Sequence, residues 1–422
     1  MAGPLGQGSR CFPYLQGVDC ALDRRPKGFH IVPRRGSPAA RAALQDPPTG
    51  RKDLFTGPVL LPNRRWTWTF PGSESEGDWE PSERRGGERR SMTSVPGTER
   101  FSVAVVTRGR ADKVRKLLQS LGSTVGSGGL ERVVLVDDSP DPLDLGPLKD
   151  ELPLSYFHSG ERLHISRAKN RALREIRTPW VFYIDDDNVV LPGTLEGALR
   201  VVSQAPWNLA ALQLSAVYRD RPDLVWVYAT PFREDHWGFE LVGRNRSRDP
   251  RWEGRLLPTD ALPNASLLRT QALREVGGFD EALPVNSSAD LCRRLKRAGW
   301  AVLAHTGSIL LHDVPPPGVP GYWAAHSNDP DRTFHEVRDW FVFQRRVHAG
   351  ERIVSGRALW HSFPFLLAIP LGLLLLRKPG MISVLAAMTR GTRDGITCGL
   401  EPRPAPEIGR GGSRLDPQIP SG

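Results

Sequence analysis

The chain has 422 residues, of which 39% are hydrophobic and 25% are charged, and its formal net charge is +10. These values fit a globular protein of one large or two ordinary domains with some disordered sequence. The scattered cysteines Cys11, Cys20, Cys292 and Cys398 exclude a CxxC metal site and a disulfide framework, which favours a reducing compartment. The basic charge indicates an anionic partner, without choosing between a nucleotide, a nucleic acid and a membrane surface.

The N-terminal part differs from the rest of the chain. Residues 1–99 are rich in Pro, Gly, Arg and Ser and lack apolar periodicity, so we predict that they are disordered. The alternative is that this extension is not translated, because Met92 lies just before the first regular segment. No apolar stretch typical of a signal peptide is present at the N-terminus.

From Phe101 onward, short apolar runs alternate with amphipathic segments. The apolar runs predict strands at 102–106, 132–140, 180–184 and 308–313. Apolar positions at helical spacing predict helices at 107–122, 165–176, 194–202, 270–276 and 290–299. This alternation predicts an α/β fold with a mostly parallel sheet and covering helices.

Polar clusters follow three of the predicted strands. They are Thr107 to Arg110, Asp137 with Asp138, and Asp185 to Asp187. Ligands of parallel sheets bind outside the carboxyl ends of the strands, so we expect these clusters to converge on one site. There Asp137 and Asp138 could accept hydrogen bonds from a nucleobase and a ribose, although a plain turn is the alternative.

Three consecutive aspartates end the apolar run 180–184, and their mutual repulsion indicates a bound cation. The D-x-D pair Asp185 and Asp187 offers hard oxygen ligands that suit Mg²⁺ or Mn²⁺, and a solvated acidic turn is the alternative. The chain has no Gly-rich phosphate loop, which excludes kinase and dinucleotide-binding readings. Phosphate charge would therefore be met by the metal and by arginines such as Arg110 or Arg167.

Several motifs together resemble family 2 glycosyltransferases over roughly residues 100–345. They are SVAVVTRGR, VVLVDDSP, HISRAKNRALREIRTPWVFYIDDDNVVLPG, REVGGFDE, ADLCRRLKRAGW and SILLHD. The resemblance implies a GT-A fold, a nucleotide-diphosphate sugar donor, a Mn²⁺ or Mg²⁺ ion, and transfer of a hexosyl or deoxyhexosyl group with inversion. It also implies a nucleotide-sugar-binding half at 100–225 and an acceptor-binding half at 226–345.

The resemblance assigns roles to particular residues. It implies donor binding by Thr107, Arg110, Asp137, Asp138, Arg167, Asn170, Asp185 and Asp186. It implies metal binding by Asp185, Asp187 and His312, of which His312 matches a late histidine that often completes the metal shell.

The chain departs from the family pattern at the general base. Ser288 occupies the position where the family usually has the catalytic aspartate, and a serine cannot remove a hydroxyl proton unaided. Asp290 is our candidate base. The alternatives are an anionic acceptor that needs no base, or a retaining mechanism or another base such as Asp260 or Asp280. Gly109, where the family usually has Asn, is a second departure.

The C-terminal part resembles the tails of bacterial family members that build cell-envelope glycans on polyprenyl-linked acceptors. Residues 346–400 are predicted to be membrane-associated, because the apolar run 363–376 is flanked by basic residues, and 401–422 to be disordered. A buried core helix or one spanning helix are the alternatives. We expect a peripheral or monotopic protein at the cytoplasmic face of the cell membrane.

The expected partners are a nucleotide-diphosphate sugar, a lipid-linked or glycan acceptor and the membrane surface. No nucleic acid is expected, because no recognition motif for it is present. Three rival functions stay open: a polyprenyl-phosphate sugar synthase, a retaining GT-A transferase, and a catalytically inactive protein that binds sugar nucleotides or glycans.

Overall fold

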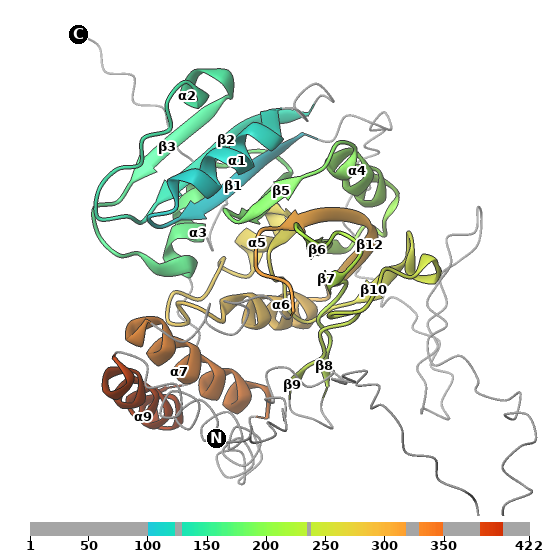
Figure 1. Ribbon diagram of the computed structural model, residues 1–422. Helices are drawn as coiled ribbons and strands as arrows, with labels where there is room; N and C mark the ends of the chain where they lie inside the picture. The colour runs from blue at the N-terminus through green and yellow to red at the C-terminus, as the bar shows by residue number, and fades with distance from the viewer. Residues whose placement is uncertain (1–99, 123–128, 234–237, 318–328, 349–379, 400–422) are drawn as a thin grey trace, which may run out of the picture. The chain divides into compact units, whose positions relative to one another are not determined.

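The computed structural model describes residues 100–122, 129–233, 238–317, 329–348 and 380–399 (Figure 1). The predicted N-terminal extension 1–99, the apolar run 363–376 and the tail 401–422 lie outside the described residues. All described residues belong to one unit of the chain.

A ten-stranded sheet forms the centre of this unit. Its strands are β1 (Phe101–Thr107), β2 (Leu130–Asp137), β3 (Leu154–His158), β4 (Trp180–Asp185), β5 (Asn188–Val190), β6 (Leu209–Tyr218), β7 (Val225–Val227), β10 (Leu256–Pro258), β11 (Ala265–Arg269) and β12 (Ala301–His312). The order is β10-β12-β6-β11-β4-β1-β2-β3, with β5 paired to β12 and β7 paired to β6 (Figure 1). The short strands β8 (Phe232–Arg233) and β9 (Gly238–Phe239) pair with each other.

The sheet is mixed, with most of its long strands parallel. Strands β3, β2, β1 and β4 pair in parallel, and so do β6 and β12. Strand β11 lies antiparallel between β4 and β6, so these two sets of strands run in the same direction. The predicted α/β class with a mostly parallel sheet is confirmed, whereas the antiparallel strand β11 was not predicted.

Helices cover both faces of the sheet. The helices are α1 (Ala111–Gly122), α2 (Leu148–Glu151), α3 (His164–Glu175), α4 (Thr194–Gln204), α5 (Thr270–Glu275), α6 (Ser287–Arg297), α7 (Pro330–Val347) and α9 (Met381–Thr397), with a 3₁₀ turn η5 (Pro250–Trp252). One apolar layer packs α1, α2 and α4 against the sheet, and a second packs α3, α5 and α6 against it. The apolar positions that predicted helix α1 are fully buried in the first layer: Val114, Leu117, Leu118 and Leu121.

Several predicted boundaries differ from the structure. Helix α6 begins at Ser287 rather than at Asp290, and strand β12 begins at Ala301 rather than at Ser308. Strand β7 starts at Val225 and pairs with β6, so the sheet continues across the predicted boundary near residue 225. Local apolar spacing detects the middle of an element better than its ends, which depend on capping and on neighbouring strands.

Helices α7 and α9 pack together through a separate apolar cluster that contains Val337, Phe341, Val384 and Met388. The last turns of α7 also reach the sheet unit, because Arg346 forms ion pairs with Asp280 and Asp290. Within the described parts of the chain, no helix is both long and apolar enough to cross a membrane.

Candidate active site

The carboxyl ends of parallel strands bring the predicted polar clusters to one edge of the sheet. In the strand registers, Val106 pairs with Asp185 and Thr107 pairs with Asp137, so β1, β2 and β4 end side by side. The backbone amide of Asp313, just after β12, donates to the carbonyl oxygen of Asp187 at 2.7 Å. This edge therefore collects residues from the beginning and the end of the sheet unit.

Asp186 is the buried centre of this edge. Its carboxylate is fully buried, accepts a 2.5 Å hydrogen bond from the Thr107 hydroxyl, and lies 2.6 Å from Nη2 of Arg110. Burial raises the pKa of Asp186 to about 6, although Arg110 and Thr107 act to lower it. Asp186 thereby fixes Arg110, which also lies 3.2 Å from Oδ2 of Asp187.

Asp187 and His312 form the closest pair of candidate metal ligands. Nε2 of His312 lies 3.4 Å from Oδ1 of Asp187, and the imidazole and the Trp226 ring pack in a T-shaped arrangement. Burial acts to raise the pKa of Asp187, but His312, Arg110 and Lys113 outweigh it, so the pKa lies below its usual value. An ionised carboxylate and an imidazole at this spacing fit one divalent ion held between them.

Asp185 is placed differently from the other two predicted ligands. Its side chain is 43% exposed, and its Oδ1 lies 4.0 Å from Nζ of Lys169. Among the described residues, Asp185, Asp187 and His312 do not bring one ligand atom each within 4.8 Å of one another. The structure thus brings together two of the three predicted metal ligands and leaves Asp185 beside a lysine.

Asp137 is fully buried and holds the loop that follows β2. Its oxygens accept hydrogen bonds from the amide and hydroxyl of Ser139, from the amide of Leu143 and from the hydroxyl of Tyr156. Burial acts to raise the pKa of Asp137, but these hydrogen bonds outweigh it and lower the pKa. The predicted contact of Asp137 with a nucleobase does not fit this geometry, because no oxygen is left open to a ligand.

Asp138 anchors the start of α3. Its oxygens accept hydrogen bonds from the backbone amides of Leu163 at 2.5 Å and His164 at 3.0 Å, and its side chain is 5% exposed. Nη1 of Arg108 lies 3.9 Å from the same carboxylate. Asp138 therefore shapes the predicted nucleotide pocket by linking β2 to α3.

The two predicted donor-binding residues on α3 have other partners. Asn170 is fully buried. Its side-chain N–H groups donate to the carbonyl oxygen of Phe279 and to a Glu281 carboxylate oxygen, and its side-chain oxygen accepts from the Phe279 amide. Donor binding by Asn170 does not fit this geometry, because both ends of its amide hold the loop around Phe279. Arg167 is half exposed, and its Nε lies 3.9 Å from a Glu281 oxygen.

Asp290 is in a buried ion-pair network rather than open to an acceptor. Its oxygens lie 2.8 Å from Nε of Arg294 and 2.8 Å from Nη1 of Arg346, and its side chain is 4% exposed. The predicted role of Asp290 as the general base does not fit this geometry, because both oxygens face guanidinium groups. The fully buried Asp280 shares Arg346 at 2.7 Å, and Asp260 lies 2.5 Å from Nζ of Lys296.

Ser288 lines a small cavity where the family pattern would place the base. The residues around this cavity are Lys169, Tyr183, Leu262, Asn264, Ser266, Leu268, Phe279 and Ser288. None of them is a carboxylate, and Lys169 links this cavity to Asp185. The described lining residues therefore offer one ammonium group, that of Lys169, but no carboxylate that could act as a general base.

Several residues of this edge were not identified from the sequence. Lys113, on α1, donates to the carbonyl oxygen of Asp313 at 2.8 Å, and Arg219 lies 3.1 Å from an Asp313 carboxylate oxygen. Lys113 follows Arg110 by three residues, a helical spacing that could have placed both at the same edge. Arg332 of α7 is paired with Glu336 at 2.7 Å; burial acts to lower its pKa, but Glu336 and, less strongly, Asp185 and Asp187 outweigh burial and raise it.

The chain resembles two solved glycosyltransferase structures. One is the mannosyltransferase PcManGT from Pyrobaculum calidifontis in complex with GDP-Man and Mn²⁺, with 14% identity, a TM-score of 0.42, and coverage of 71% of this chain and 88% of that one. The other is S. aureus TarS 1-349 in complex with UDP-GlcNAc, with 16% identity, a TM-score of 0.43, and coverage of 69% and 81%. Both TM-scores are low, so neither structure supports the assignment of a residue.

Two curated relatives have the same description and the same extent of similarity. They are the pre-mycofactocin glycosyltransferases of Mycobacterium tuberculosis strains CDC 1551 / Oshkosh and ATCC 25618 / H37Rv, each 25% identical to this chain over 222 residues. The match covers 52% of this chain and 44% of each relative, so the chain spans less than half the length of the curated relatives it matches.

The strands and helices that build the edge coincide with a match to a known family. Residues 102–276, which run from β1 to just beyond α5, match the model described as glycosyl transferase family 2. The described site residues Thr107, Arg110, Asp186 and Asp187 all lie within this match. Over residues 102–276, the chain therefore matches family 2 glycosyltransferases.

Proposed function

We propose that this chain transfers a hexosyl or deoxyhexosyl group from a nucleotide-diphosphate sugar to a glycan or lipid-linked acceptor. The observation that carries the proposal is the edge where Arg110, Asp186, Asp187 and His312 meet within hydrogen-bonding or ion-pairing distance. Such an edge offers cations for a diphosphate and anions for a metal, which are the two needs of a sugar-nucleotide site.

Asp187 and His312 would hold the divalent ion, either Mn²⁺ or Mg²⁺. When bound, this ion would neutralise charge on the donor diphosphate and on the departing nucleoside diphosphate. The chain's own residues would position that ion. Asp186 keeps Arg110 beside Asp187, and the Trp226 ring holds the His312 imidazole in place.

The acceptor hydroxyl would attack the anomeric carbon from the face opposite the leaving group, with inversion. The described carboxylates Asp260, Asp280 and Asp290 are all in ion pairs, so the base for a hydroxyl acceptor is not among these three in the described conformation. A water on the attacking face would take the proton in their place and pass it to solvent.

One observation favours a second candidate function, a polyprenyl-phosphate sugar synthase. The cavity beside Ser288 contains Lys169 and no carboxylate among its described lining residues. An acceptor that is already an anion, such as a lipid phosphate, needs no base and is attracted by an ammonium group. A lipid acceptor also agrees with the expected position at the cytoplasmic face of the membrane, which rests on the sequence outside the described residues.

Donor binding tests the proposal. Calorimetric titration of a panel of nucleotide-diphosphate sugars, with Mn²⁺, Mg²⁺ or EDTA, should find one donor that binds tightly only with metal. Asp187→Ala should weaken this binding by at least about 10-fold, since one metal ligand is removed. Asp223→Ala, at an exposed carboxylate paired with Arg221, is the matched control and should bind like the wild type.

Failure of every sugar nucleotide to bind, with or without metal, would overturn the proposal. Once the donor is known, the reaction is run with soluble glycan acceptors and with polyprenyl phosphate, and the anomeric configuration of the product is read by NMR. Transfer to polyprenyl phosphate alone would establish the second candidate function. A product that keeps the donor configuration would identify a retaining enzyme.

A further inference from the structure

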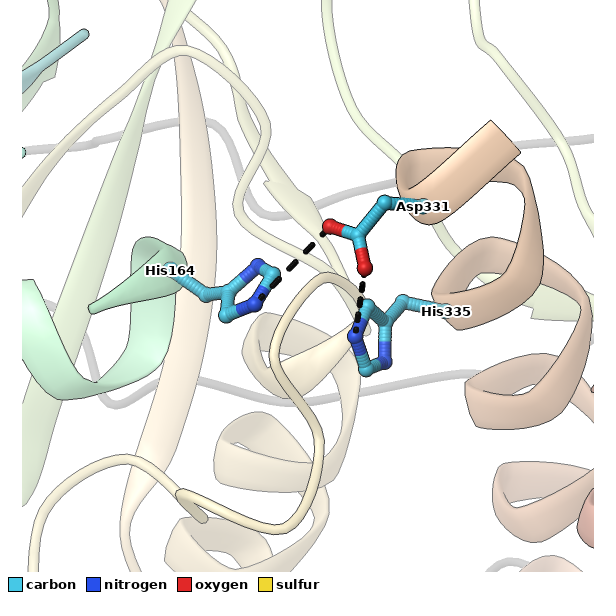
Figure 2. Close-up of side chains that lie close together, drawn as sticks. All are labelled: His164, Asp331 and His335. Atoms are coloured by element: carbon cyan, nitrogen blue, oxygen red, sulfur yellow. Dashed lines mark ion pairs between the residues drawn. The ribbon is translucent and has the colours of Figure 1, made fainter. Parts of the chain in front are cut away.

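A second group of side chains that could hold a metal lies apart from the sheet edge with Arg110, Asp186, Asp187 and His312, which we call the donor edge. His164 stands at the start of α3, and Asp331 and His335 lie one turn apart in the first half of α7 (Figure 2). One ligand atom from each lies within 4.8 Å of the other two, and within the described ranges this is the group of three that meets this condition. We refer to these residues as the His–Asp–His cluster.

We propose that the His–Asp–His cluster binds a divalent transition-metal ion of the zinc type, which fastens α7 to α3. Two imidazoles and one carboxylate form a common ligand set for Zn²⁺, and three protein ligands leave a fourth position for water or another ligand. Mixed nitrogen and oxygen ligands favour such an ion over Mg²⁺ or Ca²⁺, which prefer oxygen ligands alone.

The distances within the cluster fit an ion between the side chains better than direct hydrogen bonds. Nε2 of His335 lies 3.6 Å from Oδ1 of Asp331, and Nε2 of His164 lies 3.9 Å from Oδ2 (Figure 2). Both separations are too long for hydrogen bonds. Ligand atoms on a tetrahedral zinc ion, each about 2.1 Å from it, are roughly 3.4 Å apart, so small side-chain rotations are enough.

The rings are also oriented toward the carboxylate. Figure 2 shows the two imidazoles beside each other, each facing one oxygen of Asp331, and the ring centroids are 4.7 Å apart at an interplanar angle of 71°. Asp331 and His335 are at i and i+4 of one helix, which places them on the same face. The geometry therefore presents three ligands to one point without any change of backbone.

The backbone of His164 is held in an unusual conformation. Its φ is +60°, a left-handed value that is uncommon outside glycine and that His adopts more readily than most residues, as do Asn and Asp. The amide of His164 donates to Asp138 at 3.0 Å, which holds this conformation in place. Such local strain is concentrated at functional sites, and here it directs the histidine at the start of α3 toward α7.

Arg162 is the charged neighbour that competes for the carboxylate. Its Nη1 lies 2.8 Å from Oδ2 of Asp331, and its Nη2 lies 3.2 Å from Asp329, the N-cap residue of α7. Because Arg162 has this second partner, it can keep one hydrogen bond and orient Asp331 as an outer partner of the metal. Arg338, another nearby cation, is paired with Asp339 at 2.6 Å.

Both imidazoles are available in their neutral form. Burial is the main cause that lowers the pKa of His335 to about 4, and burial also lowers the pKa of His164. A neutral imidazole binds metal without first losing a proton. This property supports the geometric argument, which stands on the positions of the three side chains.

A metal at the cluster would order the helix beside the donor edge. Arg332 follows Asp331 directly, and the charges of Asp185 and Asp187 act on it. On the other side, His164 is joined to Asp138 and so to the end of β2. The ion would therefore hold Arg332 near the aspartates while taking no part in the transfer itself.

Zinc binding to the full-length chain tests the proposal. We would use Asp187→Ala as the background, so that the donor edge does not contribute, and titrate Zn²⁺ calorimetrically and Co²⁺ by its visible absorption. The background protein should bind one Zn²⁺, and Co²⁺ should give the absorption bands of a tetrahedral or five-coordinate site. His335→Ala and Asp331→Asn should each lower the affinity by at least about 10-fold.

Two further variants control the result. His164→Asn removes a ligand but keeps a residue that tolerates the left-handed backbone, so it should lose metal binding without unfolding. Glu336→Gln changes a carboxylate on the same helix outside the cluster and should bind Zn²⁺ like the background protein. Circular dichroism verifies that each variant is folded. The proposal is overturned if the background protein binds no Zn²⁺ at micromolar concentration, or if the cluster variants bind it unchanged.

Discussion

The Asp187 carboxylate lies 3.4 Å from the His312 imidazole, although Asp187 follows β4 and His312 ends β12, and these strands are separated in the sheet by β11 and β6. Strand β5 brings them together, because it starts right after Asp187 and pairs His312 with Asn188. The backbone hydrogen bond from Asp313 to Asp187 completes this link. The candidate metal ligands are thus positioned by a three-residue strand.

Replacing Asp290 should affect folding rather than chemistry. Asp290→Asn leaves Arg294 and Arg346 partly unpaired in a buried network, so we expect the free energy of unfolding to fall by roughly 3–5 kcal/mol. Urea denaturation measures this loss. Asp112, which is exposed and forms an ion pair with Arg115, gives the control, since Asp112→Asn should change stability by less than about 1 kcal/mol.

The activity of the same variant separates the two roles of Asp290. If the residue is structural, the folded fraction of Asp290→Asn keeps most of its kcat. A loss of kcat by about 100-fold or more at unchanged stability would identify Asp290 as the base after all.

Restoring a carboxylate at position 288 should reveal the kind of acceptor. Ser288→Asp places a potential base in the cavity beside Lys169. With a hydroxyl acceptor, we expect kcat to rise, by up to about 100-fold, because a positioned base then removes the proton. With a phosphate acceptor, the added negative charge repels the substrate, and kcat/KM should fall instead. Steady-state kinetics on both acceptor classes distinguish these outcomes.

The sequence was sufficient for the features that depend on local pattern. The strands ending at Thr107, Asp137 and Asp185 were predicted, because apolar runs followed by polar residues mark buried strands and their ends. The convergence of these ends at one edge followed from the rule for parallel sheets.

Features that depend on distant contacts could not be predicted. The short sequence of β11 does not reveal that this strand lies antiparallel between β4 and β6. Likewise, the sequence around Asp290 does not show that Arg346, from α7, lies 2.8 Å away. Asn170 has the motif position of a donor ligand, but the loop at Phe279 uses its amide.

Asp339 should give the protein a distinct dependence of stability on pH. Burial, opposed by Arg338, raises the pKa of Asp339 to about 6 from an ordinary value of 3.8. The folded state therefore binds this proton more tightly than the unfolded state. The resulting stabilisation is complete below about pH 4 and is lost as the pH rises through about 6. A shift of this size corresponds to roughly 3 kcal/mol.

Comparison with Asp339→Asn isolates this effect, because the amide resembles the protonated acid and still accepts from the Val285 amide. We would measure urea unfolding of both proteins between pH 4 and pH 8. The stability of the wild type relative to the variant should fall as the pH rises across this range. Parallel pH profiles would show that Asp339 does not titrate there.

The packing of α9 on α7 requires two glycines. A Cβ atom at Gly395 would lie 2.7 Å from Cβ of Phe341 and 2.8 Å from the carbonyl oxygen of Arg338, and Gly391 is similarly close to α7. Gly395→Ala should therefore destabilise the helix pair, by about 1–3 kcal/mol. Gly399→Ala, where the added atom meets nothing within 4 Å, is the matched control. Hydrogen exchange of the α9 amides should increase in the first variant and not in the second.

The most direct test of the donor edge is Mn²⁺ affinity in the presence of a nucleoside diphosphate, measured by electron paramagnetic resonance on the wild type and on His312→Ala. Our account places one ion between Asp187 and His312, so the variant should bind Mn²⁺ at least about 10-fold more weakly. Equal affinity in the two proteins would contradict it and would show that His312 only supports the Asp187 carboxylate.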